Sequence, residues 1–174
     1  MPRQLLLLRH AKSSWDDPSL VDHDRPLSKR GRKAAAAMRA AVFSRGPVPD
    51  MALVSTARRT RETFAALDPW PEPPAVTFQQ ALYHASPSAM LDFVREVGES
   101  CRCVLLVGHN PGLMELATLL AGGDEGVFAQ RLASGFPTGA LARFAVKGPW
   151  SALSAGSAKL IDFVVPRELK GAKT

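Results

Sequence analysis

A run of four leucines at residues 5–8 is the feature that most limits how this chain can fold. Because successive side chains of a strand point to opposite faces, an unbroken apolar run predicts a strand that is buried on both faces. Such strands occur in parallel sheets whose two faces are covered by helices. The run ends abruptly in Arg9 and His10, so this buried strand would carry a cation and an imidazole to its carboxyl end.

The rest of the chain alternates between short apolar runs and helical patterns, with Ser28 as a candidate N-cap and Pro87 in a candidate first turn. We expect strands near residues 4–8, 51–54, 103–107, 140–146 and 158–165, and helices near 29–44, 57–67, 86–98 and 111–122. This order predicts one domain over residues 1–174, a three-layer α/β/α sandwich. Its central sheet would be mostly parallel, with an antiparallel edge strand.

The formal net charge is +6, and much of the excess lies between residues 25 and 45. A basic segment can bind nucleic acid. Here the basic residues flank an alanine-rich helix, and the few aromatic residues show no stacking pattern, so we expect no nucleic-acid partner. A solvated helix face is the simplest interpretation, and attraction of anionic substrates is the alternative.

The sequence also predicts where the protein works. No apolar run approaches the roughly 20 residues that a membrane span needs, and we expect no membrane partner. Cys101 and Cys103 would lie too far apart along one strand for a comfortable disulfide. Two reduced thiols and the lack of a signal-peptide pattern predict a cytoplasmic protein, which we expect to be a monomer.

Polar side chains follow three of the expected strands. Arg9 and His10 follow the first, Arg58 and Arg59 come shortly after the second, and His109 follows the one that begins at residue 103. The carboxyl ends of parallel strands meet at one edge of a sheet, which is where ligands bind in open α/β folds. A group of cations there is costly unless an anion binds among them. A phosphoryl group fits best, because the guanidinium fork binds its oxygens in pairs.

Five segments at the ends of these elements carry a resemblance to a known family. They read RHAKSSW at 9–15, DRPLSKRG at 24–31, STARRTRET at 55–63, LYHASP at 82–87 and VGHNPGL at 107–113. The chain resembles the histidine phosphatase superfamily, also called phosphoglycerate mutase-like, and within it the compact phosphohistidine phosphatases of the SixA type. The resemblance implies a phosphatase that needs no metal and no cofactor. It also implies a covalent phosphohistidine intermediate.

The resemblance assigns a role to each of four residues. His10 would be the nucleophile, since a neutral imidazole can attack phosphorus in line and form the phosphoenzyme that water then hydrolyses. Arg9 and Arg59 would hold the equatorial oxygens of the phosphoryl group. The family pattern selects Arg59, four positions after the strand-end serine. His109 would donate a hydrogen bond to the same oxygens.

Other polar residues near these motifs have two possible roles. Arg25 is a candidate phosphate contact, and the alternative is a salt bridge with Asp22 or Asp24. His23 and His84 are expected in loops near the rim of the site.

The sequence departs from many superfamily members at the general acid. No carboxylate lies between Tyr83 and Met90, and Asp16 is the remaining candidate. Without an acid, an N–P bond is a better substrate than an alkyl ester, because a phosphorylated imidazole can take its proton from solvent. Residues 68–80 leave no room for a large lid.

An open pocket without an acid predicts a phosphorylated protein, bearing phosphohistidine, as the substrate. Two alternatives remain. One is a phosphatase of small phosphomonoesters, and the other is a non-catalytic adaptor that binds phosphate.

Overall fold

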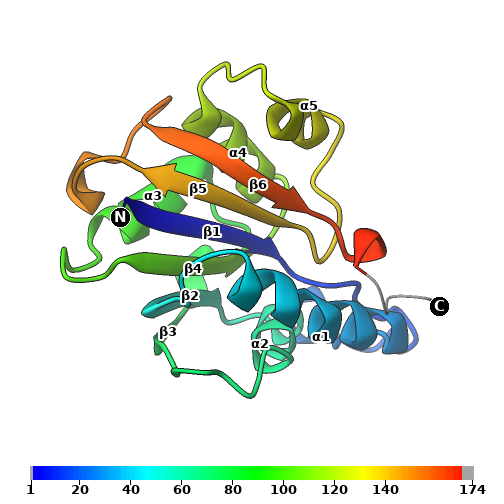
Figure 1. Cartoon of the computed structure of the whole chain (residues 1–174). Coiled ribbons are helices and arrows are strands. Elements are labelled where there is room, and N and C mark those ends of the chain that lie inside the picture. Colours follow the sequence, from blue (N-terminus) through cyan, green and yellow to red (C-terminus); the bar gives the residue numbers. More distant parts are fainter. Residues whose placement is uncertain (1, 170–174) are drawn as a thin grey trace.

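The leucine run forms β1 (Arg3–Arg9), and its side chains alternate between two cores. Leu5 and Leu7 face one side of the sheet and Leu6 and Leu8 the other, and all four are fully buried. The computed structural model describes residues 2–169 of the 174-residue chain. Figure 1 shows β1 in the middle of the sheet, with helices on both sides. The expected doubly buried strand is confirmed.

Six strands form one sheet in the order β3-β2-β4-β1-β5-β6. The other strands are β2 (Met51–Ser55), β3 (Ala75–Gln79), β4 (Cys103–Gly108), β5 (Leu141–Val146) and β6 (Ala158–Val164). The pairings among β1, β2, β3 and β4 are all parallel. β5 runs antiparallel to both β1 and β6. The expected mostly parallel sheet with an antiparallel edge is therefore confirmed, and the reversed strand lies one place in from the edge.

Helices cover the two faces of this sheet. They are α1 (Lys29–Ser44), α2 (Arg58–Ala65), α3 (Pro87–Arg95), α4 (Gly112–Ala121) and α5 (Val127–Ala133). α1 and α2 pack on the face of Leu6 and Leu8, and α3, α4 and α5 on the face of Leu5 and Leu7. The three-layer α/β/α sandwich is confirmed.

Capping residues in the sequence predicted the N-termini of α1 and α3 correctly. The Ser28 hydroxyl accepts a hydrogen bond from the Gly31 amide at 3.0 Å and caps α1. Ser86 caps α3 in the same way, and Pro87 is the first residue of that helix. Two elements, β3 and α5, were not predicted. β3 is an edge strand whose Phe78 is 47% exposed. It lacks a buried apolar run, and its pairing with β2 is what makes it a strand.

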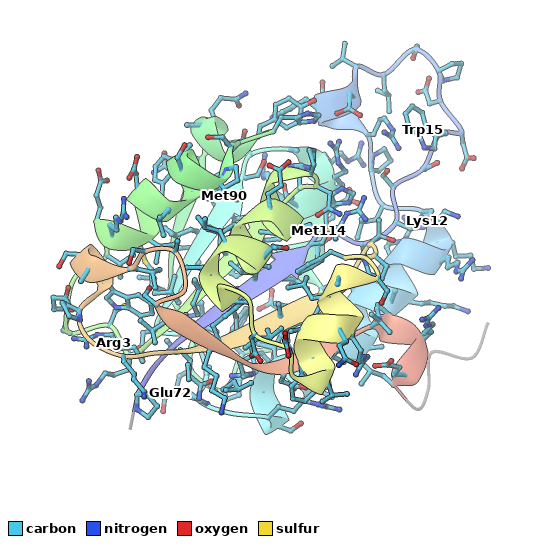
Figure 2. All side chains as sticks on the ribbon, turned by 90° about the horizontal axis from the view of Figure 1, so that it is seen from above. Arg3, Lys12, Trp15, Glu72, Met90 and Met114 are labelled. Carbon is cyan, nitrogen blue, oxygen red and sulfur yellow. The ribbon has the colours of Figure 1, made fainter. Side chains whose placement is uncertain are left out.

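The strand order explains where the polar side chains gather. β2, β4 and β1 are neighbours and run parallel, so Ser55, Gly108 and Arg9 end at one edge of the sheet. The loop after β1 carries Lys12 and Trp15, far from Arg3 at the other end of the strand (Figure 2). Four short 3-10 turns complete the fold: η1 (Asp22–Asp24), η2 (Gln80–Leu82), η3 (Trp150–Ala152) and η4 (Pro166–Glu168). Across residues 2–169, no helix has both the length and the apolar character to cross a bilayer.

Candidate active site

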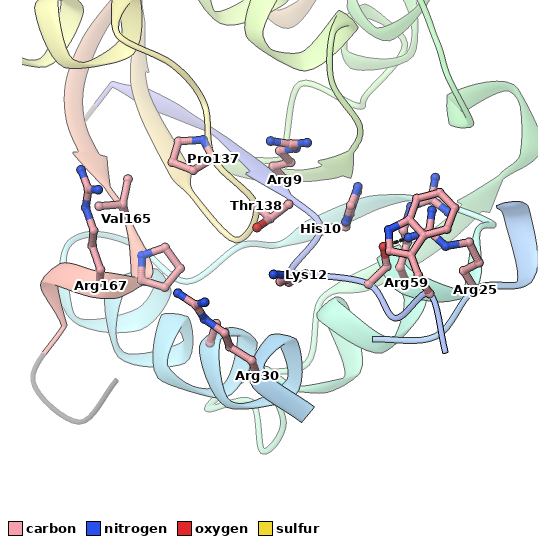
Figure 3. Close-up of a pocket in the computed structure, with 14 residues that line it drawn as sticks. Arg9, His10, Lys12, Arg25, Arg30, Arg59, Pro137, Thr138, Val165 and Arg167 are labelled. Atoms are coloured by element: carbon pink, nitrogen blue, oxygen red, sulfur yellow. Dashed lines mark hydrogen bonds between the residues drawn. The ribbon is translucent and has the colours of Figure 1, made fainter. Parts of the chain in front are cut away.

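His10 follows β1 directly and lies where the parallel strands end (Figure 3). Its backbone amide donates to the Gly108 carbonyl at 3.1 Å, which fixes it beside β4. Its ring Nδ1 lies 2.8 Å from the Ala11 carbonyl oxygen. Because a carbonyl can only accept, Nδ1 carries the proton and Nε2 keeps its lone pair. The local backbone thus selects the tautomer whose Nε2 can act as a nucleophile.

The surroundings of His10 keep its imidazole neutral. The residue is only 9% exposed, and burial is the main reason that its pKa falls from 6.5 to about 4. The hydrogen bond to Ala11 opposes this shift, whereas the charges of Arg59, Arg9 and Arg25 add to it. At neutral pH His10 is therefore uncharged, which is the form that can attack phosphorus.

Arg59 reaches the site from the first turn of α2 and is 4% exposed. Its guanidinium donates to the Asp22 carbonyl oxygen at 2.6 Å and to the Asp22 carboxylate at 3.0 Å. It also donates to Nδ1 of His109 at 3.3 Å. The neighbouring Arg58 points away and pairs with Glu62 on the exposed side of the helix. Of the two adjacent arginines, the structure brings only Arg59 to His10.

His109 follows β4, and its ring centre lies 5.2 Å from that of His10. Because the Arg59 guanidinium can only donate, Nδ1 of His109 accepts and Nε2 donates to the Ser55 hydroxyl at 2.8 Å. Burial, and then the positive charge of protonated His10 and of Arg59, lower the pKa of His109 to about 2. His109 is thus a neutral neighbour of His10. Both of its ring nitrogens have protein partners, so the predicted hydrogen bond to a phosphoryl oxygen requires its Nε2–H to turn away from Ser55.

Arg9 and Arg25 lie on either side of His10 (Figure 3). Arg9 donates to the Phe136 carbonyl at 2.8 Å, and burial lowers its pKa, with a further contribution from Arg59. Arg25 is 6% exposed and donates to the Asp22 carboxylate at 2.9 Å. The salt bridge that the sequence left open for Arg25 is therefore present. Arg25 nevertheless lines the pocket of His10, and its contact with phosphate stays a prediction.

The loop after β1 holds Arg25 in place. Arg25 donates to the Ser14 carbonyl at 3.1 Å and to the Ser13 hydroxyl, and its guanidinium stacks over the ring of Trp15. A bridge between Ser13 and Leu27 ties the two ends of this loop together. The arginine is thus set in one orientation before any ligand arrives.

Asp22 is the residue that sequence reasoning did not place in the site. Its carboxylate accepts hydrogen bonds from Arg25, from Arg59 and, at 2.6 Å, from the Tyr83 hydroxyl. Partial burial alone would raise its pKa, but the hydrogen bonds from Tyr83, Arg25 and Arg59 hold it well below the usual range. Asp22 is therefore an anion that orients two arginines. Its spacing of three residues from Arg25 was the available signal.

Among residues 2–169 the structure places no carboxylic acid at His10 that could donate a proton. Asp16 is exposed and is not among the residues that line the pocket. Asp22 is ionised and has no proton to give. His84 lies in a turn near the site, as expected, 3.4 Å from the Asp22 carboxylate. His23 lies in η1 and not in a loop, and it contacts Thr56 and Tyr83.

The pocket that contains His10 has a volume of about 610 Å³. We call Arg9, Arg25 and Arg59 the inner cations, and Lys12, Arg30 and Arg167, which also line the pocket, the outer cations. No Asp or Glu side chain from residues 2–169 lines it. Within the same range, no three His, Cys, Asp or Glu side chains are arranged to hold a metal ion. The arrangement can bind an anion and present a neutral imidazole to it.

Comparisons with known proteins agree with this geometry. A family model described as "Histidine phosphatase superfamily (branch 1)" matches residues 5–79. An uncharacterized protein of Mycobacterium tuberculosis is 36% identical over 162 residues, which is 92% of this chain and 100% of the relative.

Two solved structures, both of proteins named as candidate phosphohistidine phosphatases SixA, share the fold. The one from Agrobacterium tumefaciens is 31% identical with a TM-score of 0.81, over 95% of this chain and 99% of the other. The one from Nakamurella multipartitia is 29% identical with a TM-score of 0.85, over 95% and 97% of the two chains.

Proposed function

This chain belongs to the histidine phosphatase superfamily, and from that premise we propose that it is a metal-independent phosphatase working through a covalent phosphohistidine at His10. The observation that carries the proposal is the state of His10. Its Nδ1–H donates to the Ala11 carbonyl, and its pKa is lowered to about 4. A neutral Nε2 therefore faces a pocket of cations. A site that only bound phosphate would not need a nucleophile in this tautomer.

The reaction divides into two displacements at phosphorus. Nε2 of His10 forms a bond to phosphorus while the bond to the leaving group breaks, and the leaving nitrogen takes a proton from solvent. Water then attacks the phosphorus of the phosphoenzyme, which releases inorganic phosphate and restores His10. Arg9 and Arg59 would stabilise the equatorial oxygens in both steps, with Arg25 as a further contact. His109 would join them by turning its Nε2–H from the Ser55 hydroxyl to the phosphoryl group. The arginines would supply the positive charge that a metal supplies in other phosphatases.

We propose phosphohistidine on a protein as the substrate. The described part of the chain contributes no carboxylic acid to the pocket lining, and Asp22 is ionised, so a leaving group that departs without an acid is favoured. The two similar structures named for SixA support the same substrate class.

We also propose that the active protein is a monomer with a single domain. Its unpaired cysteines Cys101 and Cys103 suit the reducing cytoplasm.

Turnover of a graded set of substrates tests the proposal. The set contains a phosphohistidine peptide, aryl phosphates of acidic phenols and alkyl phosphates. We expect good turnover of the first two and alkyl phosphates slower by orders of magnitude, because no acid protonates an alkoxide. A weak dependence of kcat/KM on leaving-group pKa, with alkyl phosphates preferred, would favour a phosphatase of small phosphomonoesters. Phosphate binding without any turnover would favour an adaptor.

A further inference from the structure

The three outer cations have no partner within the part of the chain that the structure describes. The side chains of Lys12, Arg30 and Arg167 are exposed and make no hydrogen bond or ion pair with another of residues 2–169. The inner cations differ, because each donates to a protein oxygen. One phosphoryl group needs only the inner set, so the outer set is extra positive charge in the same pocket.

The fold fixes the backbone that carries Lys12 and Arg30. The Lys12 carbonyl accepts hydrogen bonds from the Ser28 amide at 2.9 Å and from its hydroxyl at 3.1 Å. A Cβ at Gly31 would lie 2.0 Å from this carbonyl, so only glycine lets the loop pack so closely on α1. This packing places Lys12 beside the first turn of α1, which carries Arg30. The two cations therefore extend from one closely packed corner of the fold into the same pocket.

Arg167 approaches from the other chain end. It lies on η4, and its neighbour Glu168 is paired with Arg131 instead of Arg167. In Figure 3 Arg30 and Arg167 lie on the left and lower side of the pocket, and Arg25 and Arg59 lie on the right. Two distant parts of the sequence thus contribute cations to one side of the pocket.

Folding stability does not account for this charge. The first two turns of α1 contain no fewer cations than Lys29, Arg30, Arg32 and Lys33, and its first turn has no acidic residue. Cations at the N-terminus of a helix face the positive end of its dipole and are unfavourable there. Their accumulation beside the pocket is explained if they attract an anion in the substrate.

We propose that Lys12, Arg30 and Arg167 form a second anion subsite, which binds an acidic side chain next to the phosphohistidine of a protein substrate. The inference rests on the proposed function and narrows its substrate class to phosphohistidines in acidic surroundings. The outer cations are exposed, so their anion would remain in contact with water, as it does on a protein surface. A small ligand would instead need enclosure over most of its surface.

Binding of paired peptides tests the subsite. Two short phosphohistidine peptides, identical except for Glu or Gln at the flanking positions, are bound to a His10→Ala chain and followed by fluorescence anisotropy. We expect the Glu peptide to bind about tenfold more tightly, the combined effect of a few exposed ion pairs. Arg30→Gln with Arg167→Gln should lower this preference to about twofold. Equal binding of the two peptides overturns the inference.

Controls keep the result specific. Lys147→Gln with Lys159→Gln removes the same charge from exposed positions near the other end of the sheet, and should keep the full preference. If this control variant lost the preference for the Glu peptide equally, net charge alone would explain the preference, and the subsite would be overturned. High salt should remove the preference in the chain with its outer cations intact, which gives a reading that does not depend on folding of the variants. A preference that persists in high salt also counts against the subsite.

Two further measurements distinguish failure of the subsite from failure of the proposed function. Turnover of the two phosphopeptides by the unaltered chain tests the proposed function, whereas the binding ratio tests the subsite. Propane-1,3-diol bisphosphate and its monophosphate provide a second pair of ligands. A larger gain from the second phosphate than from the acidic flanks would assign the subsite to small molecules and overturn the protein-borne form.

Discussion

The inner and outer cations of the pocket carry the same charge but are held in different ways. Arg25 and Arg59 are almost completely buried, and both donate to Asp22. The outer cations, such as Arg30, are exposed on the rim. Burying a guanidinium is costly, and its hydrogen bonds to fixed oxygens offset that cost while fixing its direction. The inner set can therefore hold a transition state in one geometry, and the outer set can attract an anion without fixing it.

The largest expected effect comes from removing the group that the inner cations surround. His10→Ala should lower turnover of a phosphohistidine peptide by at least about 10³-fold, because His10 is the pocket residue with a free imidazole lone pair, whereas Nδ1 of its neighbour His109 already accepts from Arg59. Rate and circular dichroism are measured on one preparation. More than a few per cent of residual activity in a folded variant would rule out His10 as the nucleophile.

Two adjacent arginines provide the next test. Arg59→Ala should reduce kcat by about 10²–10³-fold, because it removes a buried donor from the developing charge. Arg58→Ala is the matched control: it removes only an exposed pair with Glu62, and activity should stay within about threefold. Kinetics of both variants on one aryl phosphate make the comparison. Equal losses would mean that charge alone matters and that the inner set has no special geometry.

How far the sequence predicts this molecule depends on how local each signal is. The leucines of β1 and the Ser28 cap act through neighbours in the chain, and they predicted the central strand and α1 correctly. β3 was missed because its side chains stay partly exposed, and its pairing with β2 is a long-range contact. Local patterns carry no information of that kind.

The same distinction applies to the site. His10 and Arg59 follow strand ends, so the topology of the sheet was enough to place them together. Asp22 lies in η1, between β1 and α1, and its contacts with Arg59 and Tyr83 bridge separations of 37 and 61 residues. The sequence could pair it only with the nearby Arg25. Its position between two arginines required the structure.

Asp22 gives the third test, since it orients inner cations without lining the pocket. Asp22→Asn keeps the shape but removes the charge that aligns Arg25 and Arg59. We expect kcat to fall about tenfold while KM stays equal or decreases, because the freed arginines still bind phosphate but no longer fit the transition state. Asp24→Asn, at an exposed neighbour, is the control. A raised KM with unchanged kcat would contradict this positioning role.

Salt should separate the two sets by a smaller amount. Raising ionic strength from about 0.05 M to 0.5 M shortens the screening length to a few ångströms and weakens exposed charges more than buried ones. For a small aryl phosphate we expect kcat/KM to fall about three- to fivefold and kcat by less than about twofold. The dependence should be flatter after Arg30→Gln and Arg167→Gln. An equal decrease in kcat would show that the inner cations are screened as well.

The smallest effect is expected from acid, and of the two sets of cations only the inner one contributes to it. A pKa of about 4 leaves roughly nine-tenths of His10 neutral at pH 5, whereas the ordinary value of 6.5 would leave about 3%. The neutral fraction should therefore change less than about twofold between pH 7 and pH 5 and fall only below that range. The chemical shift of the His10 ring proton, assigned by its loss in His10→Ala, measures this fraction without interference from substrate ionisation.

Burial causes most of the lowering of the His10 pKa, and Arg59 adds to it, so Arg59→Ala should move the titration midpoint upward. Arg30 is not among the causes, and Arg30→Gln should leave the midpoint in place. A midpoint near 6.5 in the unaltered chain would contradict the lowered pKa of His10. Equal shifts in the two variants would mean that the inner and outer cations act on His10 alike.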